Sequence, residues 1–419
     1  MTCQFVIEGG GRLDGDYQVQ GNKNAALPLI AAALLARRRV TLHNTPRIVD
    51  VENMLRLIEP LGVSVHWNGT SLCLDTSCLL PGQLDAEVVD QLRGAILLLG
   101  PLASLWGEVS CALPGGCPIG RRSFAVHWSA FRAAGFSVRE DRRGIELRRT
   151  GDPRNPRVYL EESSVTATEN ALLLFAALGG GLIENPAREP HVLSLVDFLG
   201  ALGCRIGLHP LYFRVGGQVG KRRSAIEFEV PGDYIDAGTI AIAAAVTSGR
   251  LRLRGVGERE LMGIRPVLEK FGMAFTRISE AAWEVSASGL SSPSQVTAGP
   301  WPLFPTDLVS LAIILATQSA GLCLVHDWMY EARMFFVDKL VRMGGRVTMC
   351  DPHRVLVEGN TRLQGTRLES PDIRAGMALV VAGLCAEGTT RIEHAEVIKR
   401  GYQDVVERLG DVGAEIREE

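Results

Sequence analysis

The sequence lacks the patterns that would point to a metal site, a disulfide framework or a membrane span. Its nine cysteines are an odd, scattered set without paired CxxC spacing or a histidine-rich partner segment. Its longest apolar runs are interrupted by glycine, proline or threonine. The N-terminal residues also lack the basic and apolar regions of a signal peptide. We therefore expect no bound metal, no membrane association and a cytoplasmic location.

Strong net charge and disordered tracts are missing as well. The 419 residues have a net charge of -3, so nothing attracts the whole chain to nucleic acid, and the basic clusters at 37–39 and 221–223 are interpreted as solvated turns. A hydrophobic fraction of 46% and a charged fraction of 22% are typical of a folded globular protein. This length exceeds one ordinary hydrophobic core, which predicts two domains.

A repeated unit is the main feature of the sequence. Each copy has an Ala/Leu-rich helix, a short β-branched strand, a second helix with one polar face, a glycine and another strand. Six copies of about 70 residues account for the whole length. The first helices are apolar nearly all round and should be buried, whereas the second helices should be exposed on one side. They are predicted to begin near Lys23, Arg93, Thr168, Ile235, Thr306 and Ile373.

The repeats predict an α/β fold of two domains with three units each. We expect residues 23–232 to form domain I, and residues 1–22 together with 233–419 to form domain II. The segments FVIEGG and YQVQG near the N-terminus are predicted to form a strand pair that completes the last unit.

The segment from Leu113 to Arg122, LPGGCPIGRR, is the most unusual stretch. Two glycines and a proline constrain the backbone around Cys117, which should present the thiol at the tip of a loop. Arg121 and Arg122 would favour the thiolate and could bind phosphate or carboxylate. An ordinary Gly/Pro turn is the competing interpretation, and the loop alone does not decide between them.

Cations stand where several of the buried helices begin. Thr168, Asp233 and Thr306 are explained as helix caps. Lys23, Arg93 and Arg374 are not caps, because a positive charge at a helix N-terminus opposes the helix dipole unless an anion binds there. A phosphate or carboxylate site is therefore predicted. If both halves direct these helix ends into one interdomain cleft, the cleft would suit a phosphate ester.

These motifs together resemble the enolpyruvyl transferases over nearly the whole chain. The resemblance implies two inside-out α/β barrel domains with the active site in the cleft between them, and no cofactor. The matching stretches run from Gly21 to Ala36, Arg93 to Ala103, Leu113 to Arg122, Glu184 to Pro190, Phe304 to Asp307, Tyr330 to Met334, Pro371 to Gly376, Ala386 to Thr390 and Lys399 to Tyr402.

The resemblance also implies a reaction, in which the enolpyruvyl group of phosphoenolpyruvate is transferred to an acceptor hydroxyl and phosphate is released through a tetrahedral intermediate. Cys117 would be the general acid on a mobile lid loop, and Asp307 the general base. Lys23 and Arg400 would complete the catalytic set. The residues implied to bind phosphoenolpyruvate are Lys23, Arg122, Arg333, Asp372, Arg374 and Arg400.

The acceptor side of the resemblance leaves alternatives open. The matching positions are Asn24, Arg93, Ser164, Glu189, Asp307 and Met329. Ser123, Ala125 and Glu162 depart from the family pattern where uracil and diphosphate would bind. We expect UDP-N-acetylglucosamine as acceptor, in peptidoglycan biosynthesis. The alternatives are a nucleoside monophosphate such as UMP, in nucleoside-antibiotic biosynthesis, and a non-catalytic paralogue. The 5-enolpyruvylshikimate-3-phosphate synthase branch fits less well because it lacks the lid cysteine.

Overall fold

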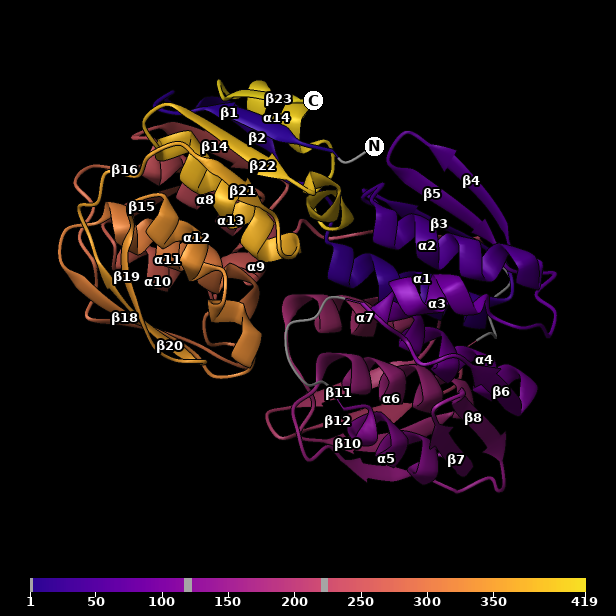
Figure 1. Cartoon of the computed structure of the whole chain (residues 1–419). Helices are drawn as coiled ribbons and strands as arrows, with labels where there is room; N and C mark the ends of the chain where they lie inside the picture. The colour runs from indigo at the N-terminus through magenta and orange to yellow at the C-terminus, as the bar shows by residue number, and fades with distance from the viewer. Residues whose placement is uncertain (1–2, 117–122, 220–224) are drawn as a thin grey trace. The chain divides into compact units, whose positions relative to one another are not determined.

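The computed structural model describes residues 3–116, 123–219 and 225–419 (Figure 1). The predicted Cys117 loop and the basic cluster at 221–223 lie outside these residues. Backbone contacts divide the described chain into two compact units. We call them the 21–231 unit, which contains residues 21–116 and 123–231, and the 232–419 unit, which also contains residues 3–20.

Three sheets surround buried helices in the 21–231 unit. In strand order they are β13 (Ile226–Glu229), β3 (Arg39–His43), β5 (Ser71–Asp75) and β4 (Ser64–Asn68); β6 (Glu108–Cys111), β8 (Gly144–Arg149) and β7 (Phe136–Asp141); and β11 (Arg205–His209), β12 (Tyr212–Gly216), β10 (Gly180–Glu184) and β9 (Arg157–Tyr159). The helices are α1 (Lys23–Ala36), α2 (Val49–Ile58), η1 (Glu59–Leu61), α3 (Ala86–Gln91), η2 (Arg93–Leu98), α4 (Leu99–Trp106), α5 (Ala125–Ala133), α6 (Val165–Leu178) and α7 (Pro190–Ala201).

The 232–419 unit repeats this plan. Its sheets are β15 (Met273–Ser279), β16 (Ala282–Ala287), β14 (Arg250–Arg254) and β2 (Asp14–Gln18); β17 (Gln295–Ala298), β18 (Leu322–Asp327), β20 (Arg354–Glu358) and β19 (Arg346–Asp351); and β21 (Arg367–Glu369), β22 (Thr389–Glu393), β1 (Phe5–Glu8) and β23 (Glu415–Glu418). Its helices are α8 (Tyr234–Val246), α9 (Glu258–Leu261), α10 (Arg265–Glu269), η3 (Thr306–Leu308), α11 (Val309–Gln318), η4 (Glu331–Met334), α12 (Val337–Arg342), α13 (Ile373–Cys385), η5 (Ala395–Arg400) and α14 (Val405–Gly410).

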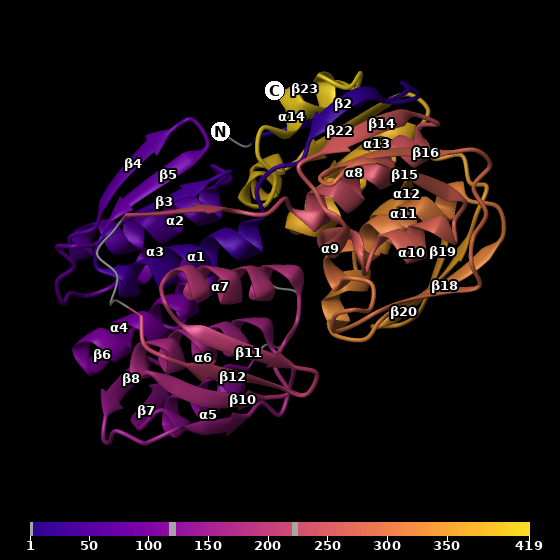
Figure 2. The same ribbon diagram turned by 180° about the vertical axis from the view of Figure 1, so that it is seen from behind.

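The first helix of each sequence repeat is buried, as its composition predicts. Every residue of α1 except Asn24 is buried, and every residue of α13 except Cys385. Alanine permits this close packing, since its small side chain lets neighbouring helices approach one another. Helices α8, α11 and α13 contact one another and are enclosed by the strands of their unit (Figure 2). Helices thus lie inside and sheets outside, which is the predicted inside-out α/β architecture.

The two N-terminal strands do not pair with each other, and this part of the prediction is wrong. β1 lies antiparallel between β22 and β23 and completes the last sheet, whereas β2 lies parallel to β14 in another sheet. Ion pairs accompany the pairing of β2 with β14. Asp16 on β2 pairs with Arg254 at 2.9 Å and with Arg252 at 3.6 Å, both on the basic strand β14.

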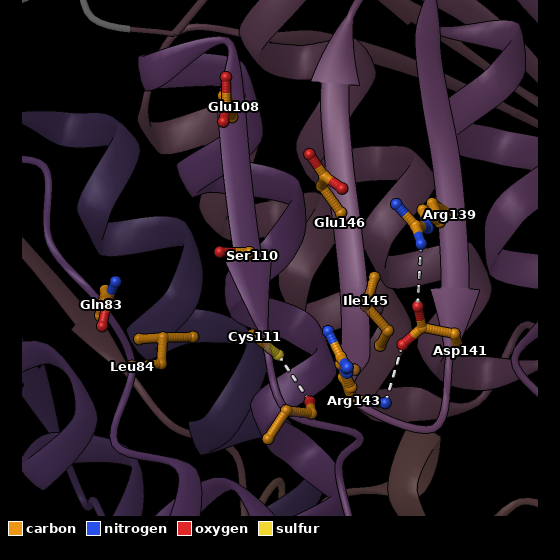
Figure 3. Close-up of a pocket in the computed structure, with 12 residues that line it drawn as sticks. Gln83, Leu84, Glu108, Ser110, Cys111, Arg139, Asp141, Arg143, Ile145 and Glu146 are labelled. Carbon is orange, nitrogen blue, oxygen red and sulfur yellow. Dashed lines mark hydrogen bonds and ion pairs between the residues drawn. The ribbon is translucent and has the colours of Figure 1, made fainter.

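The β6 sheet differs from the other five. Each of those five has a parallel strand beside the strand that follows its buried helix, whereas the β6 sheet has three strands among the described residues. The segment that could supply the fourth contains Pro81 and Gly82, and proline cannot donate to a strand ladder. A pocket of about 440 Å³ lies here instead, and Figure 3 shows Glu108 and Ser110 of β6 among its lining residues.

No helix in the described part of the chain is both long enough and apolar enough to cross a membrane.

Candidate active site

Asp307 lies between two arginines in the 232–419 unit. It belongs to η3, at the start of the buried helix α11. Arg374 donates to its Oδ2 from Nε at 3.0 Å and from Nη2 at 2.8 Å, and Arg333 Nη2 donates to its Oδ1. Both arginines are 5% exposed. Each carboxylate oxygen is therefore held by a separate guanidinium group. We call these three residues the Asp307 clamp.

Asp372 caps the helix that carries Arg374. Its Oδ1 accepts hydrogen bonds from the backbone N–H groups of Arg374, at 2.8 Å, and Ala375, at 3.0 Å. A carboxylate at this position interacts favourably with the positive end of the helix dipole, whereas the positive charge of the Arg374 side chain is unfavourable there. The carboxylate of Asp307 lies at the Arg374 guanidinium and that of Asp372 at its backbone N–H, and binding of a phosphate or carboxylate ligand at Arg374 stays a prediction.

The surroundings of Arg374 keep it charged despite its burial. Desolvation by itself would lower the pKa of this guanidinium, but Asp307, Tyr402 and Asp233 outweigh it and the pKa rises. The guanidinium carbon lies 5.3 Å from the centre of the Tyr402 ring, and desolvation raises the pKa of that phenol. Arg374 is thus a fixed positive charge in a buried environment.

Asp233 is a buried acid that the sequence had indicated only as a helix cap. Its Oδ1 accepts from the Ile235 N–H at 2.9 Å, which is the expected cap on α8. Burial raises its pKa to about 6, although the positive charge of Arg374 acts in the opposite direction. The burial that raises this pKa could not be predicted from the sequence, because it depends on residues brought together from distant segments.

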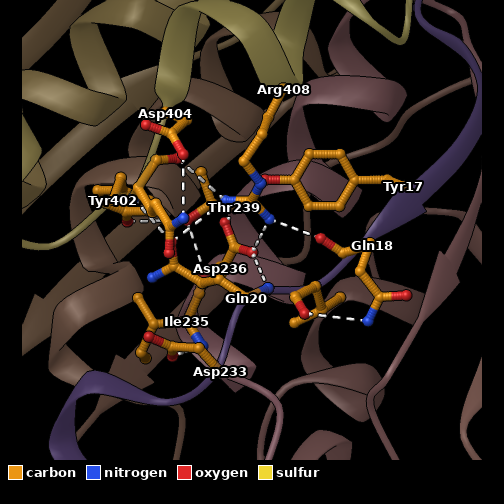
Figure 4. Close-up of polar contacts among 12 residues, drawn as sticks. Tyr17, Gln18, Gln20, Asp233, Ile235, Asp236, Thr239, Tyr402, Asp404 and Arg408 are labelled. Carbon is orange, nitrogen blue, oxygen red and sulfur yellow. Dashed lines mark hydrogen bonds and ion pairs between the residues drawn. The ribbon is translucent and has the colours of Figure 1, made fainter. Parts of the chain in front are cut away.

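An ion-pair network fixes the start of α8 (Figure 4). Asp236 is 1% exposed and accepts from Tyr17 Oη at 3.0 Å, from the Gln20 N–H at 3.0 Å and from Arg408 Nη2 at 2.9 Å. The Arg408 guanidinium carbon lies 4.5 Å from the centre of the Tyr17 ring. Residues from both ends of the chain therefore hold the helix that carries Asp233.

Lys23 and Asn24 begin α1 in the 21–231 unit. Lys23 is 9% exposed, and its Nζ lies 2.5 Å from Oδ2 of Asp50, which is 4% exposed. Asn24 is half-buried beside it. The sequence did not indicate Asp50 as the partner of Lys23, since nothing in the local pattern around residue 50 distinguishes it from the acidic first turn of an exposed helix.

Three predicted acceptor residues lie on segments that contact or adjoin α6. Ser164 is its N-cap residue, and its carbonyl accepts from Thr168 Oγ1 at 2.7 Å. The same hydroxyl accepts from the Ala187 N–H at 2.9 Å, which fixes the segment leading to Glu189. Arg93 begins η2, with its guanidinium carbon 3.7 Å from the centre of the Phe124 ring.

Glu169 is a further buried acid on α6 that the sequence analysis missed. It is 1% exposed, and its Oε1 has no hydrogen-bond partner among the described residues. Burial raises its pKa well above the usual range, and the negative charge of Glu189 raises it further. Burial of this kind favours the neutral form of the carboxyl group.

The structure defines the surroundings of the other predicted residues in less detail. Met329 donates its backbone N–H to Asp327 Oδ1 at 2.9 Å, and Asp327 in turn accepts from Thr306, the neighbour of Asp307, at 2.5 Å. Arg400 ends the short helix η5 and is half-buried. Cys117 and Arg122 lie outside the described residues.

Known proteins resemble this chain over its full length. The family model described as EPSP synthase (3-phosphoshikimate 1-carboxyvinyltransferase) matches residues 7–409. The UDP-N-acetylglucosamine 1-carboxyvinyltransferase of Bradyrhizobium diazoefficiens is 40% identical, with 99% of this chain and 97% of the relative covered. The enzyme of that name from Treponema pallidum is 39% identical, with both chains covered completely.

Two solved structures share the fold. The enolpyruvyl transferase NikO from Streptomyces tendae matches with a TM-score of 0.90 at 23% identity, covering 100% of this chain and 99% of its own. An EPSP synthase from Acinetobacter baumannii matches with a TM-score of 0.77 at 17% identity, covering both chains completely. From the family model and the full-length relatives, the chain belongs to the EPSP synthase family of enolpyruvyl (1-carboxyvinyl) transferases.

Proposed function

We propose that this protein transfers the 1-carboxyvinyl group of phosphoenolpyruvate to a hydroxyl of UDP-N-acetylglucosamine and releases phosphate, a step of peptidoglycan precursor synthesis. The observation that carries the proposal is the identity of 33% to 40% with curated enzymes of that name, over 97% to 100% of their lengths. The Asp307 clamp supports it, because a positioned carboxylate is the group that the first step requires.

Asp307 is the general base of the proposed mechanism. It takes the proton of the acceptor hydroxyl while the hydroxyl oxygen bonds to C2 of phosphoenolpyruvate. Cys117 gives a proton to the methylene carbon, and the product of this addition is a tetrahedral intermediate. Loss of a proton from the new methyl group then expels phosphate and restores the double bond. The clamp holds both carboxylate oxygens, which limits the orientations of the base.

Phosphoenolpyruvate binds through cations that the structure pairs with internal carboxylates. In the 21–231 unit Lys23 is paired with Asp50. In the 232–419 unit Arg333 and Arg374 share the single carboxylate of Asp307, so these three residues keep one net positive charge for an incoming anion. Arg333 Nε is buried and has no acceptor among the described residues, which leaves it as a donor for a phosphate or carboxylate oxygen. Arg122, Asp372 and Arg400 complete this proposed set.

The acceptor is held by a second set of residues. Arg93 and Asn24 supply donors for the diphosphate and its neighbours. The Thr168 hydroxyl of α6 donates to the Ser164 carbonyl and accepts from the N–H of Ala187, two residues before Glu189. Met329 lies on the segment that Asp327 fastens beside Asp307. The acceptor hydroxyl must reach Asp307, and Asp327 links the segment of Met329 to Thr306, the neighbour of Asp307.

A nucleoside monophosphate is the second candidate acceptor. Ser123, Ala125 and Glu162 favour it, because these residues depart from the family pattern at the positions for uracil and diphosphate. An exposed glutamate near a diphosphate is electrostatically unfavourable. The reaction chemistry of the two candidates is the same, and only the acceptor differs.

Phosphate release from phosphoenolpyruvate tests both candidates. The assay compares UDP-N-acetylglucosamine, UMP and buffer, and mass spectrometry identifies the enol-ether product. Turnover with the nucleotide sugar supports the proposal. Turnover with UMP but not with UDP-N-acetylglucosamine would identify UMP as the acceptor and leave the proposed reaction unchanged. No turnover with either acceptor contradicts both candidates. Asp307→Asn is the negative control for each acceptor.

A further inference from the structure

A buried histidine is bound across one turn of α6. Thr166 and Asn170 are four residues apart and therefore lie on the same face of the helix. The imidazole of His127, from α5, lies between them and is 2% exposed. Its Nε2 is 3.1 Å from Thr166 Oγ1, and its Nδ1 is 3.1 Å from Asn170 Nδ2.

The hydrogen bonds of Asn170 fix the tautomer of this ring. Its Oδ1 accepts from the Gly100 N–H at 3.1 Å, which identifies the other branch of the amide as the nitrogen. That nitrogen donates to the Ile96 carbonyl at 3.1 Å and to His127 Nδ1. Nδ1 must therefore carry the lone pair, and Nε2 the proton that it donates to Thr166. The ring is neutral and is held in one tautomer.

The same contacts connect His127 to Arg93. Ile96 lies on η2, the helical segment that Arg93 begins, and Gly100 lies on α4, which follows directly. A second connection runs through Phe124, whose ring centre is 5.9 Å from the imidazole and 3.7 Å from the Arg93 guanidinium carbon. The helical segment that Arg93 begins is thus connected to His127 through Asn170, and the Arg93 side chain is connected to it through Phe124.

We propose that His127 is a positioning residue for the acceptor, which holds Arg93 in place as a neutral Nε2–H imidazole. This inference rests on the proposed function, in which Arg93 binds the anionic part of a nucleotide acceptor. A neutral ring adds no second positive charge beside Arg93, whereas an imidazolium there would repel the guanidinium group. The competing interpretation is a core histidine that contributes only to stability.

Kinetics of His127 variants separate these interpretations. We expect His127→Leu to raise KM for the acceptor about tenfold, the effect of losing roughly one well-placed interaction, with KM for phosphoenolpyruvate changed less than about twofold. His127→Asn should recover most of this loss, because its Oδ1 can accept from Asn170 as Nδ1 does. Val215→Ala, in the core of the same unit on β12, is the matched control that lowers stability without touching this network.

Nitrogen NMR of the histidine side chains gives an independent measurement. The His127 signals are identified by their loss in His127→Asn, and we expect a protonated Nε2 and an unprotonated Nδ1. Thr166→Val should keep this tautomer, because Asn170 still donates to Nδ1.

Three results would overturn the inference: a protonated Nδ1, an unchanged acceptor KM in His127→Leu, or an equal rise in both KM values. A rise in acceptor KM in Val215→Ala would also assign the effect to stability. The acceptor used is the one that the wild-type enzyme turns over. If that is UMP, the proposed acceptor has failed while His127 is still tested.

Discussion

The Asp307 clamp and the α6 network hold their candidate residues by different forces. In the clamp, charged groups hold charged groups, as Arg333 and Arg374 bind Asp307. In the α6 network, neutral hydrogen bonds join Thr166, His127 and Asn170. The Lys23–Asp50 pair follows the first pattern. Three of the residues proposed to meet phosphoenolpyruvate, Lys23, Arg333 and Arg374, are therefore ion-paired, whereas the network behind the proposed acceptor residue Arg93 is uncharged.

This difference has a physical reason. A buried cation needs an internal counter-ion when no substrate is present, and an incoming anion can compete for it. A neutral hydrogen-bond network cannot exchange partners with an anion in this way, so its geometry persists when ligand binds. In these two groups of residues, ion pairs hold the side chains proposed to change partners during the reaction, and neutral hydrogen bonds hold the segment proposed to stay fixed. The following changes test this comparison.

The largest effect is expected from Asp307→Asn. The variant removes both the proposed base and the shared counter-ion of Arg333 and Arg374, and we expect kcat to fall about 10²- to 10⁴-fold. Steady-state kinetics with the active acceptor measures this loss. Asp307→Glu keeps the charge and serves as the control for an effect of geometry alone. A kcat of Asp307→Asn within a few-fold of wild type would contradict the assignment of the base.

Breaking the buried Asp236–Arg408 pair should cost about 3–5 kcal/mol of unfolding free energy, because Arg408→Met leaves Asp236 as an uncompensated buried charge. Denaturant unfolding measures the change. Arg254→Met is the matched control, since it breaks a half-exposed pair with Asp16, and we expect a cost of about 0–1 kcal/mol. Equal costs in the two variants would mean that burial of the pair does not determine its contribution.

Asp233 predicts a dependence of stability on pH. Burial raises its folded-state pKa to about 6, above the value of about 4 expected in the unfolded chain. The folded protein therefore binds the extra proton between pH 4 and 6, and the contribution of Asp233 to stability falls by about 2–3 kcal/mol as pH rises through this window. The unfolding free energy of wild type minus that of Asp233→Asn should therefore decrease by this amount as pH rises from 4 to 6, as measured by denaturant unfolding. A value that stays constant, or increases, over this range contradicts the pKa shift.

Glu169→Gln should have the smallest effect. Burial raises the pKa of Glu169 and favours its neutral form, and glutamine has a similar shape and is also neutral. We expect the unfolding free energy to change by less than about 1 kcal/mol at pH 7. At higher pH the wild type alone must ionise a buried group, so the variant should become relatively more stable. Denaturant unfolding from pH 6 to 9 measures this, and a large loss at pH 7 would mean that Glu169 is charged.

The repeated architecture could be predicted because its signals are local. Apolar residues on all sides of a segment indicate a buried helix, and each such segment was correctly located. Two helices are interrupted where the periodic pattern continues. Residues 262–264 separate α9 from α10, and Pro266 stands in the first turn of α10, where it has no N–H to donate to a preceding turn. The transition from η2 to α4 falls at Leu99, and Asn170 packs against the next residue, Gly100.

The partners of the site residues could not be predicted in the same way. Arg408 and Asp236 are 172 residues apart, and Arg374 and Asp307 are 67 apart. No periodicity relates such positions, so the sequence indicates an unusual cation without indicating its counter-ion. For Lys23 and Arg374 the expectation of a bound anion followed from the helix dipole, and the structure supplies Asp50 and Asp307. Binding of phosphoenolpyruvate at these residues stays a prediction.

The β6 sheet, with three strands among the described residues, has a consequence for aggregation of the protein. An edge strand offers its unpaired backbone groups to other chains, and such edges are where aggregation begins. Here the edge is short, and Glu108 on it is paired with Arg148 at 3.3 Å, features that discourage pairing between molecules. An apolar residue in place of Glu108 would remove that protection and favour pairing between molecules at this edge.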